Sequence, residues 1–148
     1  MKNLILLCFL TTGITVYGQK NTPAVSVPAP VTQKFQQQFP QATDVKWKEN
    51  KAKLYKVEFK SGTTKKGHDA WFDASGNLVK QKVDISKDEL PAAVKQAIQQ
   101  QFAGYTIHDT DKIDEKGVFS YKVELKKKPE EREVTFSNTG KVLENVLK

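Results

Sequence analysis

The sequence contains a single cysteine, Cys8, among its 148 residues. Cys8 lies within the first eighteen residues, which we expect to be removed, so the remaining chain would contain no cysteine. That chain can form no disulfide, offers no cysteine nucleophile and cannot build a zinc site from thiolates. Its stability must then come from the burial of apolar side chains.

Arginine is equally scarce, because Arg132 is the only one and the other basic side chains are lysines. The formal net charge of +7 raises the question of a polyanionic partner. Lysine, however, lacks the planar, forked guanidinium that suits phosphates and base edges. We therefore interpret the lysines as a solvated surface and expect no nucleic acid partner.

The first 18 residues have the pattern of a signal peptide. Lys2 precedes an apolar run from Leu4 to Val16, and Val16-Tyr17-Gly18 offers a cleavage position. This run is too short to span a bilayer comfortably, and no second apolar run follows it. We expect cleavage near Gly18, a periplasmic or secreted location and no stable membrane insertion. Residues 19–30 contain three prolines and are interpreted as an extended linker.

Three segments of the chain recur in the same order, at offsets of 63, 66 and 64 residues. The pairs are Gln36–Phe39 with Gln99–Phe102, Tyr55–Phe59 with Tyr121–Leu125, and Phe72–Gly76 with Phe136–Gly140. Such an ordered recurrence indicates an internal duplication. We divide the chain into repeat 1 (31–85) and repeat 2 (86–148).

Each repeat opens with a pattern typical of an amphipathic helix. The apolar stripe of the first consists of Val31, Phe35 and Phe39, and that of the second of Leu90, Val94, Ala97, Ile98 and Phe102. Ser86 and Glu89 match a capping box, which predicts that the second helix begins there. Pro91 marks an alternative start, because proline suits the first helical turn.

Four strands are predicted after each helix. Apolar and charged residues alternate in 54–60 and 121–126, which is typical of half-buried antiparallel strands. The other predicted strands lie at 44–48, around 70–72 and at 78–85, and at 106–113, around 134–136 and at 142–147. Val45 and Trp47 are expected to face the core. The sequence therefore predicts an α+β fold of two tandem repeats, each with one helix packed on a four-stranded antiparallel sheet. We expect the two repeats to pack side by side, with a continuous sheet as one arrangement, and the uncovered face would bear lysine and glutamate.

Together these motifs resemble those of a known family. They comprise Phe39-Pro40, Val45-Lys46-Trp47, Tyr55 to Phe59, Phe72 to Gly76, Leu90 to Val94 and the second Tyr-x-Val-Glu strand at Tyr121. They look like those of PepSY-like proteins, whose tandem fold is similar to the β-lactamase inhibitor protein. The likeness covers about Val31 to Leu147. It implies a small exported protein whose sheet can bind another protein, and it implies no catalytic residue.

No residue pattern indicates catalysis, a metal site or a cofactor. His68-Asp69 and His108-Asp109 are two His-Asp pairs, but adjacent residues on a strand point to opposite faces. We interpret both histidines as solvated. The sequence has no nucleophile elbow and no glycine-rich phosphate loop. We predict that the protein is not an enzyme, and a hydrolase with an unrecognised site is a less favoured hypothesis.

Trp71 is the most informative side chain. If Ala70 and Phe72 face the helix, alternation places Trp71 on the open side of the sheet. A large aromatic side chain beside lysines is typical of protein contact sites. We predict a partner-binding site formed by Trp71, Lys56, Lys60 and Asp69. In the alternative interpretation, the other repeat or the linker covers Trp71.

The sequence as a whole predicts a non-catalytic exported binding protein. It would engage a protein partner in the cell envelope through the open sheet face, and inhibition of that partner is one form of this function. The alternative is a protein that binds a small or anionic ligand in the groove between the two repeats. The identity of the partner and the oligomeric state are left open.

Overall fold

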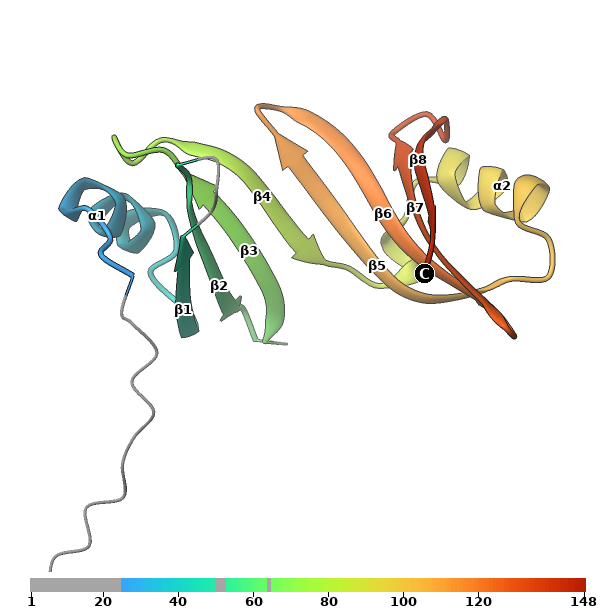
Figure 1. Cartoon of the computed structure of the whole chain (residues 1–148), viewed down its shortest axis with the longest axis horizontal. Helices are drawn as coiled ribbons and strands as arrows, with labels where there is room; N and C mark the ends of the chain where they lie inside the picture. The colour runs from blue at the N-terminus through green and yellow to red at the C-terminus, as the bar shows by residue number, and fades with distance from the viewer. Residues whose placement is uncertain (1–24, 50–52, 64) are drawn as a thin grey trace, which may run out of the picture.

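A computed structural model describes residues 25–49, 53–63 and 65–148 (Figure 1). The predicted signal peptide and the first part of the predicted linker lie outside these residues. The helices are α1 (Ala29–Gln38) and α2 (Ala92–Gln101), and a 3-10 turn, η1, spans Lys87–Glu89. The strands are β1 (Thr43–Glu49), β2 (Tyr55–Ser61), β3 (Lys66–Phe72), β4 (Leu78–Asp84), β5 (Thr106–Glu115), β6 (Val118–Lys127), β7 (Glu130–Ser137) and β8 (Val142–Leu147).

The strands form one eight-stranded antiparallel sheet in the order β1 to β8, so neighbours in sequence are neighbours in space. β4, the last strand of repeat 1, pairs with β5, the first strand of repeat 2, from Lys80 opposite Glu115 to Asp84 opposite Asp111. This pairing makes the sheet continuous. The predicted fold class, with one helix and four strands in each repeat, is confirmed.

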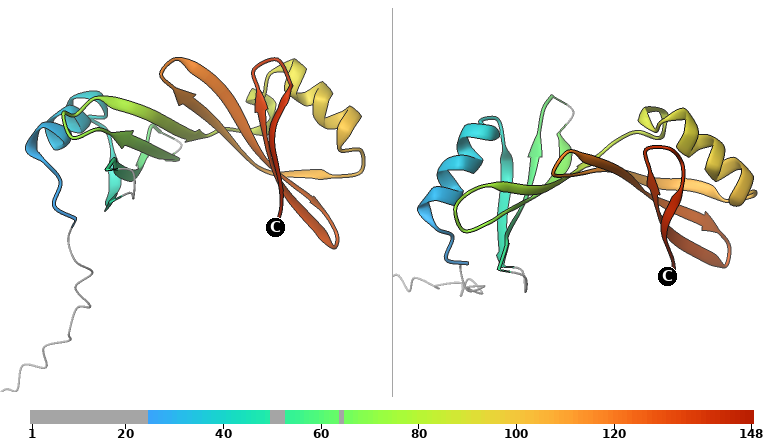
Figure 2. Two further views of the ribbon diagram at one scale, coloured as in Figure 1. Left: turned by 45° about the horizontal axis from the view of Figure 1, so that its top comes forward. Right: turned by 90° about the horizontal axis from the view of Figure 1, so that it is seen from above.

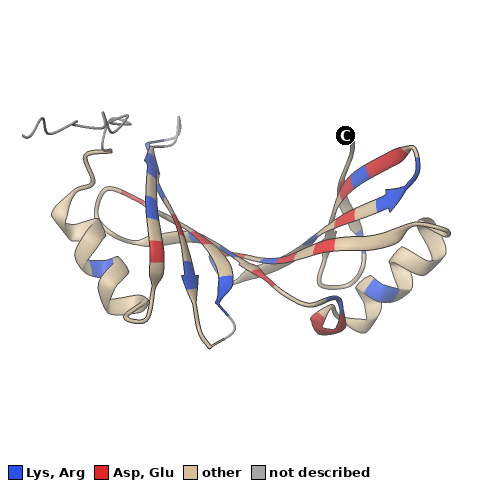
Figure 3. Ribbon diagram, turned by 90° about the horizontal axis from the view of Figure 1, so that it is seen from below, with Lys and Arg blue, Asp and Glu red and all other residues tan. Residues whose placement is uncertain are grey.

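Both helices lie on the same side of the sheet, one towards each end (Figure 2). The sheet twists and bends between them, so that the side away from the helices is concave along the long axis (Figure 3). Each helix therefore covers only its own repeat, and the other face of the sheet is left without a covering layer.

Each repeat has its own hydrophobic core between its helix and its strands. In repeat 1 the buried residues are Val31, Phe35, Val57, Phe59, Ala70 and Phe72. In repeat 2 they are Leu90, Val94, Ala97, Ile98, Phe102, Tyr121, Val123, Leu125, Val134 and Phe136. The predicted apolar stripes are thus the buried ones, with Phe39 partly buried where α1 ends. Phe35 contacts Phe59 edge to face, with ring centroids 5.1 Å apart.

The turn between the last two strands of each repeat is held by one side chain. The Asp73 carboxylate accepts hydrogen bonds from the backbone N–H groups of Ser75 and Asn77 at 2.9 and 3.0 Å. In repeat 2 the Ser137 hydroxyl accepts from Thr139 and Lys141 at 3.3 and 3.1 Å. Asp73 therefore has a structural role that serine fills equally well.

The predicted capping box exists, but the second helix does not begin there; it begins at the alternative position marked by Pro91. The Glu89 carboxylate accepts a hydrogen bond from the Ser86 N–H at 2.7 Å, and this box caps η1. Leu90 then adopts extended backbone geometry, and α2 begins at Ala92 with Pro91 as its N-cap. A proline disfavours helical backbone geometry at the residue before it. Leu90, which precedes Pro91, therefore adopts extended geometry and separates η1 from α2.

The prediction that Val45 faces the core is also wrong. β1 contains a bulge, because Thr43 pairs with Lys60 while Lys46 pairs with Glu58. Asp44 has a positive φ of 54°, and Val45 is left 41% exposed. Trp47 does pack against the repeat 1 core, with its ring centroid 5.3 Å from that of Phe35, but it remains half-buried at the edge of the sheet. The bulge interrupts the ladder and leaves Val45 at the rim of the helix side, where it lines an open hollow with Trp47 instead of packing into the core.

The folded part begins before Val31. α1 starts at Ala29 with Pro28 as its N-cap, and Val27 packs against the repeat 1 core. The last residues of the segment interpreted as a linker therefore contribute to the fold.

Two glycines with nearly the same backbone geometry provide a matched test of whether the β7–β8 turn packs tightly against α2. Gly140 (φ +81°) lies so close to α2 that an added Cβ would overlap the carbonyl oxygen of Ala93, whereas Gly117 (φ +85°) has nothing within 4 Å. We predict that Gly117→Ala costs about 1 kcal/mol of unfolding free energy through backbone strain alone. Gly140→Ala should cost about 1–3 kcal/mol more, because backbone must move.

Urea unfolding of both variants and the wild-type protein measures this difference. Equal losses for the two variants would contradict a tight contact between the β7–β8 turn and α2.

Candidate functional site

The candidate site lies on the face of the sheet away from α1 and α2, which we call the open face. The strand register continues one alternation from β2 to β8, so every second side chain points to this face. Its central side chains are Lys56, Glu58, Lys60, Asp69, Trp71, Lys80, Lys82 and Asp84 in repeat 1, and Asp111, Ile113, Glu115, Ser120, Lys122, Glu124, Glu133, Thr135 and Glu144 in repeat 2. The surface carries lysine and acidic residues, as predicted.

A hollow of about 520 Å³ occupies the middle of the open face and is lined from both repeats. We call it the trough. Trp71 and Lys56 line it on one side, and Ile113, Ser120 and Thr135 line it on the other. It spans the β4–β5 seam, so it exists only because the two repeats share one sheet.

Trp71 lies on the open face, as alternation from the buried Ala70 and Phe72 requires, and its side chain is half-buried. The Lys56 and Lys80 ammonium groups lie 5.2 and 5.5 Å from its ring centroid. Such cation–π contacts contribute about 0.5–1 kcal/mol each at exposed sites. Trp71 is thus shielded partly by two lysines of its own repeat.

Lys56 also connects two acidic side chains of the open face. Its ammonium nitrogen lies 2.9 Å from Glu58 Oε1 and 3.0 Å from Asp69 Oδ2. Hydrogen bonds from Lys48 and Lys56 lower the pKa of the Glu58 carboxyl to about 2. The group is therefore ionised at neutral pH, and the network holds the long Lys56 side chain over Trp71.

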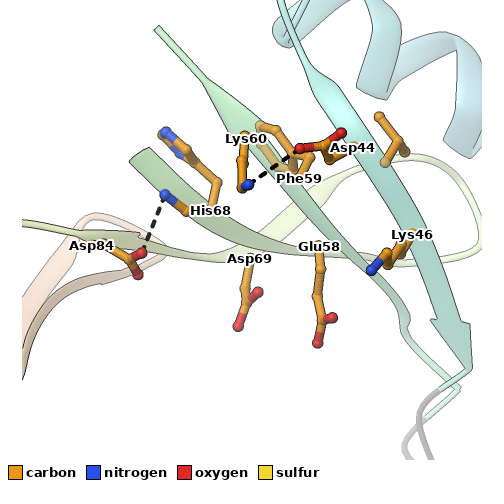
Figure 4. Close-up of a pocket in the computed structure, with 10 residues that line it drawn as sticks. Asp44, Lys46, Glu58, Phe59, Lys60, His68, Asp69 and Asp84 are labelled. Atoms are coloured by element: carbon orange, nitrogen blue, oxygen red, sulfur yellow. Dashed lines mark hydrogen bonds and ion pairs between the residues drawn. The ribbon is translucent and has the colours of Figure 1, made fainter. Parts of the chain in front are cut away.

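The structure brings together three of the four predicted site residues. Lys56, Asp69 and Trp71 line the trough, whereas Lys60 does not. Lys60 pairs with Asp44 at 3.3 Å in a second hollow, of about 480 Å³, beside the β1 bulge (Figure 4). There Glu58 and Asp69 point together to one side of the sheet, while the His68 ring points to the other (Figure 4).

Sequence reasoning missed Asp111, which lies on the open face at the seam and is only 3% exposed. Its Oδ2 atom lies 3.1 Å from Lys82 Nζ, and its Oδ1 atom has no hydrogen-bond partner among the described residues. Burial raises the pKa of the Asp111 carboxyl to about 6, although Lys82 opposes the change and Asp84 reinforces it. No local signal marks this residue, because the pairing of β4 with β5 creates its environment.

His68 and Asp69 lie on opposite faces of the sheet as predicted, whereas His108 lies at a bulge of β5, with its Nε2 atom 4.0 Å from Glu124 Oε1 on the open face. The His68 ring stacks on Phe59 with centroids 5.0 Å apart, on the helix side of the sheet, and burial lowers the pKa of His68. His68 is half-buried, so the interpretation of it as solvated is wrong; His108 is exposed. In the part of the chain that the structure describes, no three His, Cys, Asp or Glu side chains form a group able to hold a metal ion.

A third hollow, of about 330 Å³, lies between α1 and the edge strand β1. Phe35, Phe39, Val45 and Trp47 give it an apolar lining. It lies on the helix side of the sheet, away from Trp71, and shares no residue with the trough.

These features define a class of protein: a tandem helix-on-sheet repeat with one concave sheet face left uncovered. The chain belongs to the family described as "Putative beta-lactamase-inhibitor-like, PepSY-like", which matches residues 14–65 and 53–144. The two matched segments overlap at residues 53–65 and together span 14–144, so they cover both repeats without marking the boundary between them. The resemblance found in the sequence is confirmed.

Several solved structures share the fold. A BLIP-like protein from Bacteroides fragilis has a TM-score of 0.69 at 18% identity, over 87% of this chain and 92% of that one. A "putative periplasmic" protein from Bacteroides eggerthii has a TM-score of 0.74 at 19% identity, over 82% and 89%. A DUF2874 family protein from Bacteroides uniformis has a TM-score of 0.72 at 22% identity, over 82% and 90%. No curated protein matches the chain.

Neither α1 nor α2 is long and apolar enough to cross a membrane, and the described residues contain no other candidate helix.

The buried Asp111 predicts a pH dependence of stability. An unfolded aspartate has a pKa of about 3.9, and the folded value is about 6, so the folded state binds protons more tightly. The associated stability is fully present below pH 4 and is lost as the pH rises through about 6. We expect the unfolding free energy of the wild-type protein to fall by about 1–2 kcal/mol relative to Asp111→Asn between pH 4 and pH 7.

Urea unfolding of both proteins across this pH range tests the prediction. Taking the difference removes the contributions of other carboxyls, such as Glu58, which titrate in both proteins. A difference that stays constant with pH would contradict the prediction, because it would show that folding does not raise the pKa of Asp111.

Proposed function

We propose that this protein is a non-catalytic, exported binding protein that engages another protein of the cell envelope through its open face. The observation that carries the proposal is the concave, uncovered sheet with the half-buried Trp71 in its trough. An aromatic side chain in a partly desolvated hollow, surrounded by polar side chains, is the usual arrangement of an interface hot spot.

The side chains and backbone of the open face are already held in place before a partner binds. Lys48, Lys56, Lys122 and Lys126 each lie within 3.0 Å of a carboxylate oxygen on this face. The backbone below is held by two ladder partners on every inner strand. Such a surface loses little conformational freedom when a partner binds, and that loss is a main cost of association.

The family description supports a protein partner. The name of the B. fragilis relative and of the family both refer to an inhibitor of β-lactamase. For this chain we propose the general form of that activity: the open face covers a functional surface of its partner and can thereby inhibit it. The fold alone does not determine which protein is bound.

The proposal includes export. Residues 1–18 act as a signal peptide with cleavage near Gly18, residues 19–30 lead into the fold, and 31–85 and 86–148 are the two repeats. The "putative periplasmic" description of the B. eggerthii relative supports this compartment.

The second candidate function is capture of a small or anionic ligand in the groove between the repeats. The trough favours it in one respect, because residues of both repeats line a hollow of about 520 Å³. Glu115, Glu133 and Glu144 in the lining disfavour a simple anion.

Affinity capture tests the protein-binding function. The mature chain (19–148) serves as bait for an envelope extract of its own host, in parallel with Trp71→Ala. We predict that a protein is retained by the wild-type bait and lost with Trp71→Ala, because removing the aromatic anchor costs about 2 kcal/mol or more of binding free energy.

Phe119→Ala is a matched control. Phe119 is an aromatic residue that is 40% exposed, but it lies on the helix side of the sheet, beneath Lys112. The variant should retain the partner. Equal retention by Trp71→Ala and wild type would remove the support for the open face as the binding surface, and a thermal shift with small anions alone would favour the second candidate function.

A further inference from the structure

The two sides of the trough carry opposite charge. The side formed by repeat 1 has three lysines and one aspartate, and the side formed by repeat 2 has one lysine and three glutamates. The eight residues are Lys56, Lys80, Lys82 and Asp69 on one side, and Lys122, Glu115, Glu133 and Glu144 on the other. The trough is therefore bipolar, positive on the repeat 1 side and negative on the repeat 2 side.

The duplicated fold shows which of these charges are structural. Lys56 and Asp69 form an ion pair at 3.0 Å, and their counterparts in repeat 2, Lys122 and Glu133, form one at 2.8 Å. The two repeats thus keep the same cross-strand ion pair. Because each pair joins one lysine to one acidic residue, it adds no net charge to its side of the trough. This pair belongs to the scaffold.

The polarity comes from positions at which the two repeats differ. Trp71 pairs with Lys80 on β4, and at the equivalent place Thr135 pairs with Glu144 on β8. Repeat 1 thus has a cationic side chain beside an aromatic one, where repeat 2 has an anionic side chain beside a small polar one. Because the two repeats share one fold and carry different side chains at these positions, the fold does not require either set.

Within the trough, Lys80, Glu115 and Glu144 are the charged side chains that form no ion pair shorter than 3.8 Å among the described residues. The nearest anion to Lys80 is Glu115, across the seam, at 3.8 Å. Glu144 forms no ion pair with any residue that the structure describes, and its strand lies at the exposed end of the sheet. Charges without internal partners are the ones that can pair with an incoming molecule at the least cost.

We propose that the trough binds a protruding loop of the partner protein in one orientation, with an acidic side chain over Trp71 and a basic side chain against Glu144. Lys80 receives the acidic side chain. This assignment rests on the proposed function, because it specifies the chemistry of the protein that binds the open face. A loop suits the concave surface (Figure 3), and the reversed orientation places like charges together, which opposes binding.

Disulfide-closed β-hairpin peptides of equal length, each with one central tryptophan, provide defined probes. One carries two glutamates on one strand end and two lysines on the other, a second carries four glutamates, and a third carries four lysines. Titration of the mature chain at low ionic strength, followed by amide chemical shifts, should show the bipolar hairpin binding about 10-fold more tightly than either uniform hairpin.

Charge reversals test the named residues. Lys80→Glu and Glu144→Lys should each weaken binding of the bipolar hairpin about 10-fold. Lys141→Glu, in an exposed turn outside the trough, makes the same charge change as Lys80→Glu and should leave the affinity unchanged. A spin label at the acidic end should broaden the amides of Lys56 and Trp71, and not those of Thr135 and Glu144.

Several outcomes would overturn the inference. The four-glutamate hairpin could bind as tightly as the bipolar one, which would make the trough a general anion site. The spin label could broaden both sides equally, or Lys80→Glu and Glu144→Lys could leave the affinity unchanged; either result would show that the charges do not orient the ligand.

The inference and the proposed function fail separately. If the protein captured from the extract is lost with Trp71→Ala but retained by both Lys80→Glu and Glu144→Lys, the open face is the binding surface and the bipolar recognition is wrong. If the hairpin binds in the expected orientation while Trp71→Ala captures the same proteins as wild type, the bipolar trough stands and the proposed function does not.

Discussion

The pairing of β4 with β5 is the constraint on which the rest of the structure depends. Five residue pairs across this seam join two small units into one sheet. A repeat of this size buries too little surface to be very stable alone, and each would expose an additional free strand edge. The seam removes two of those edges and gives both repeats a common backbone frame. It also brings Lys80 beside Glu115, so the candidate site and the stability of the sheet depend on the same contact.

The seam has an energetic cost. Asp84 and Asp111 lie directly opposite each other, and Asp111 is nearly inaccessible to solvent. Like charges in cross-strand positions destabilise a sheet, and a buried carboxylate is costly unless it is paired. Lys82 compensates in part, since its ammonium lies 3.1 Å from Asp111 and within 4.0 Å of both Asp69 and Asp84. Raising the pKa of Asp111 lets the site hold a proton and so relieves the remaining repulsion.

Comparison of the two repeats separates positions that the fold requires from positions that it tolerates. Phe72 and Phe136 are both fully buried, and Gly76 and Gly140 both have positive φ beside a helix. Asp73 and Ser137 differ in chemistry but hold the same turn. On the open face, by contrast, Trp71 corresponds to Thr135 and Lys80 to Glu144. The structural positions have been kept after the duplication, while the open face has diverged in charge and in size.

The sequence by itself determined the local elements and their duplication. Spacing of Val31 and Phe35, or alternation through Val57 and Phe59, identifies a helix face or a strand face because these periods are fixed by backbone geometry. Alternation also placed Trp71 on the open face and separated His68 from Asp69. Only the tertiary structure decided the rest. The bulge at Asp44, the burial of Asp111 and the opposed charges of the trough all depend on which strands pair and in what register. Residues more than twenty positions apart, such as Lys82 and Asp111, become neighbours only when β4 and β5 join, so no local pattern in the sequence records their contact.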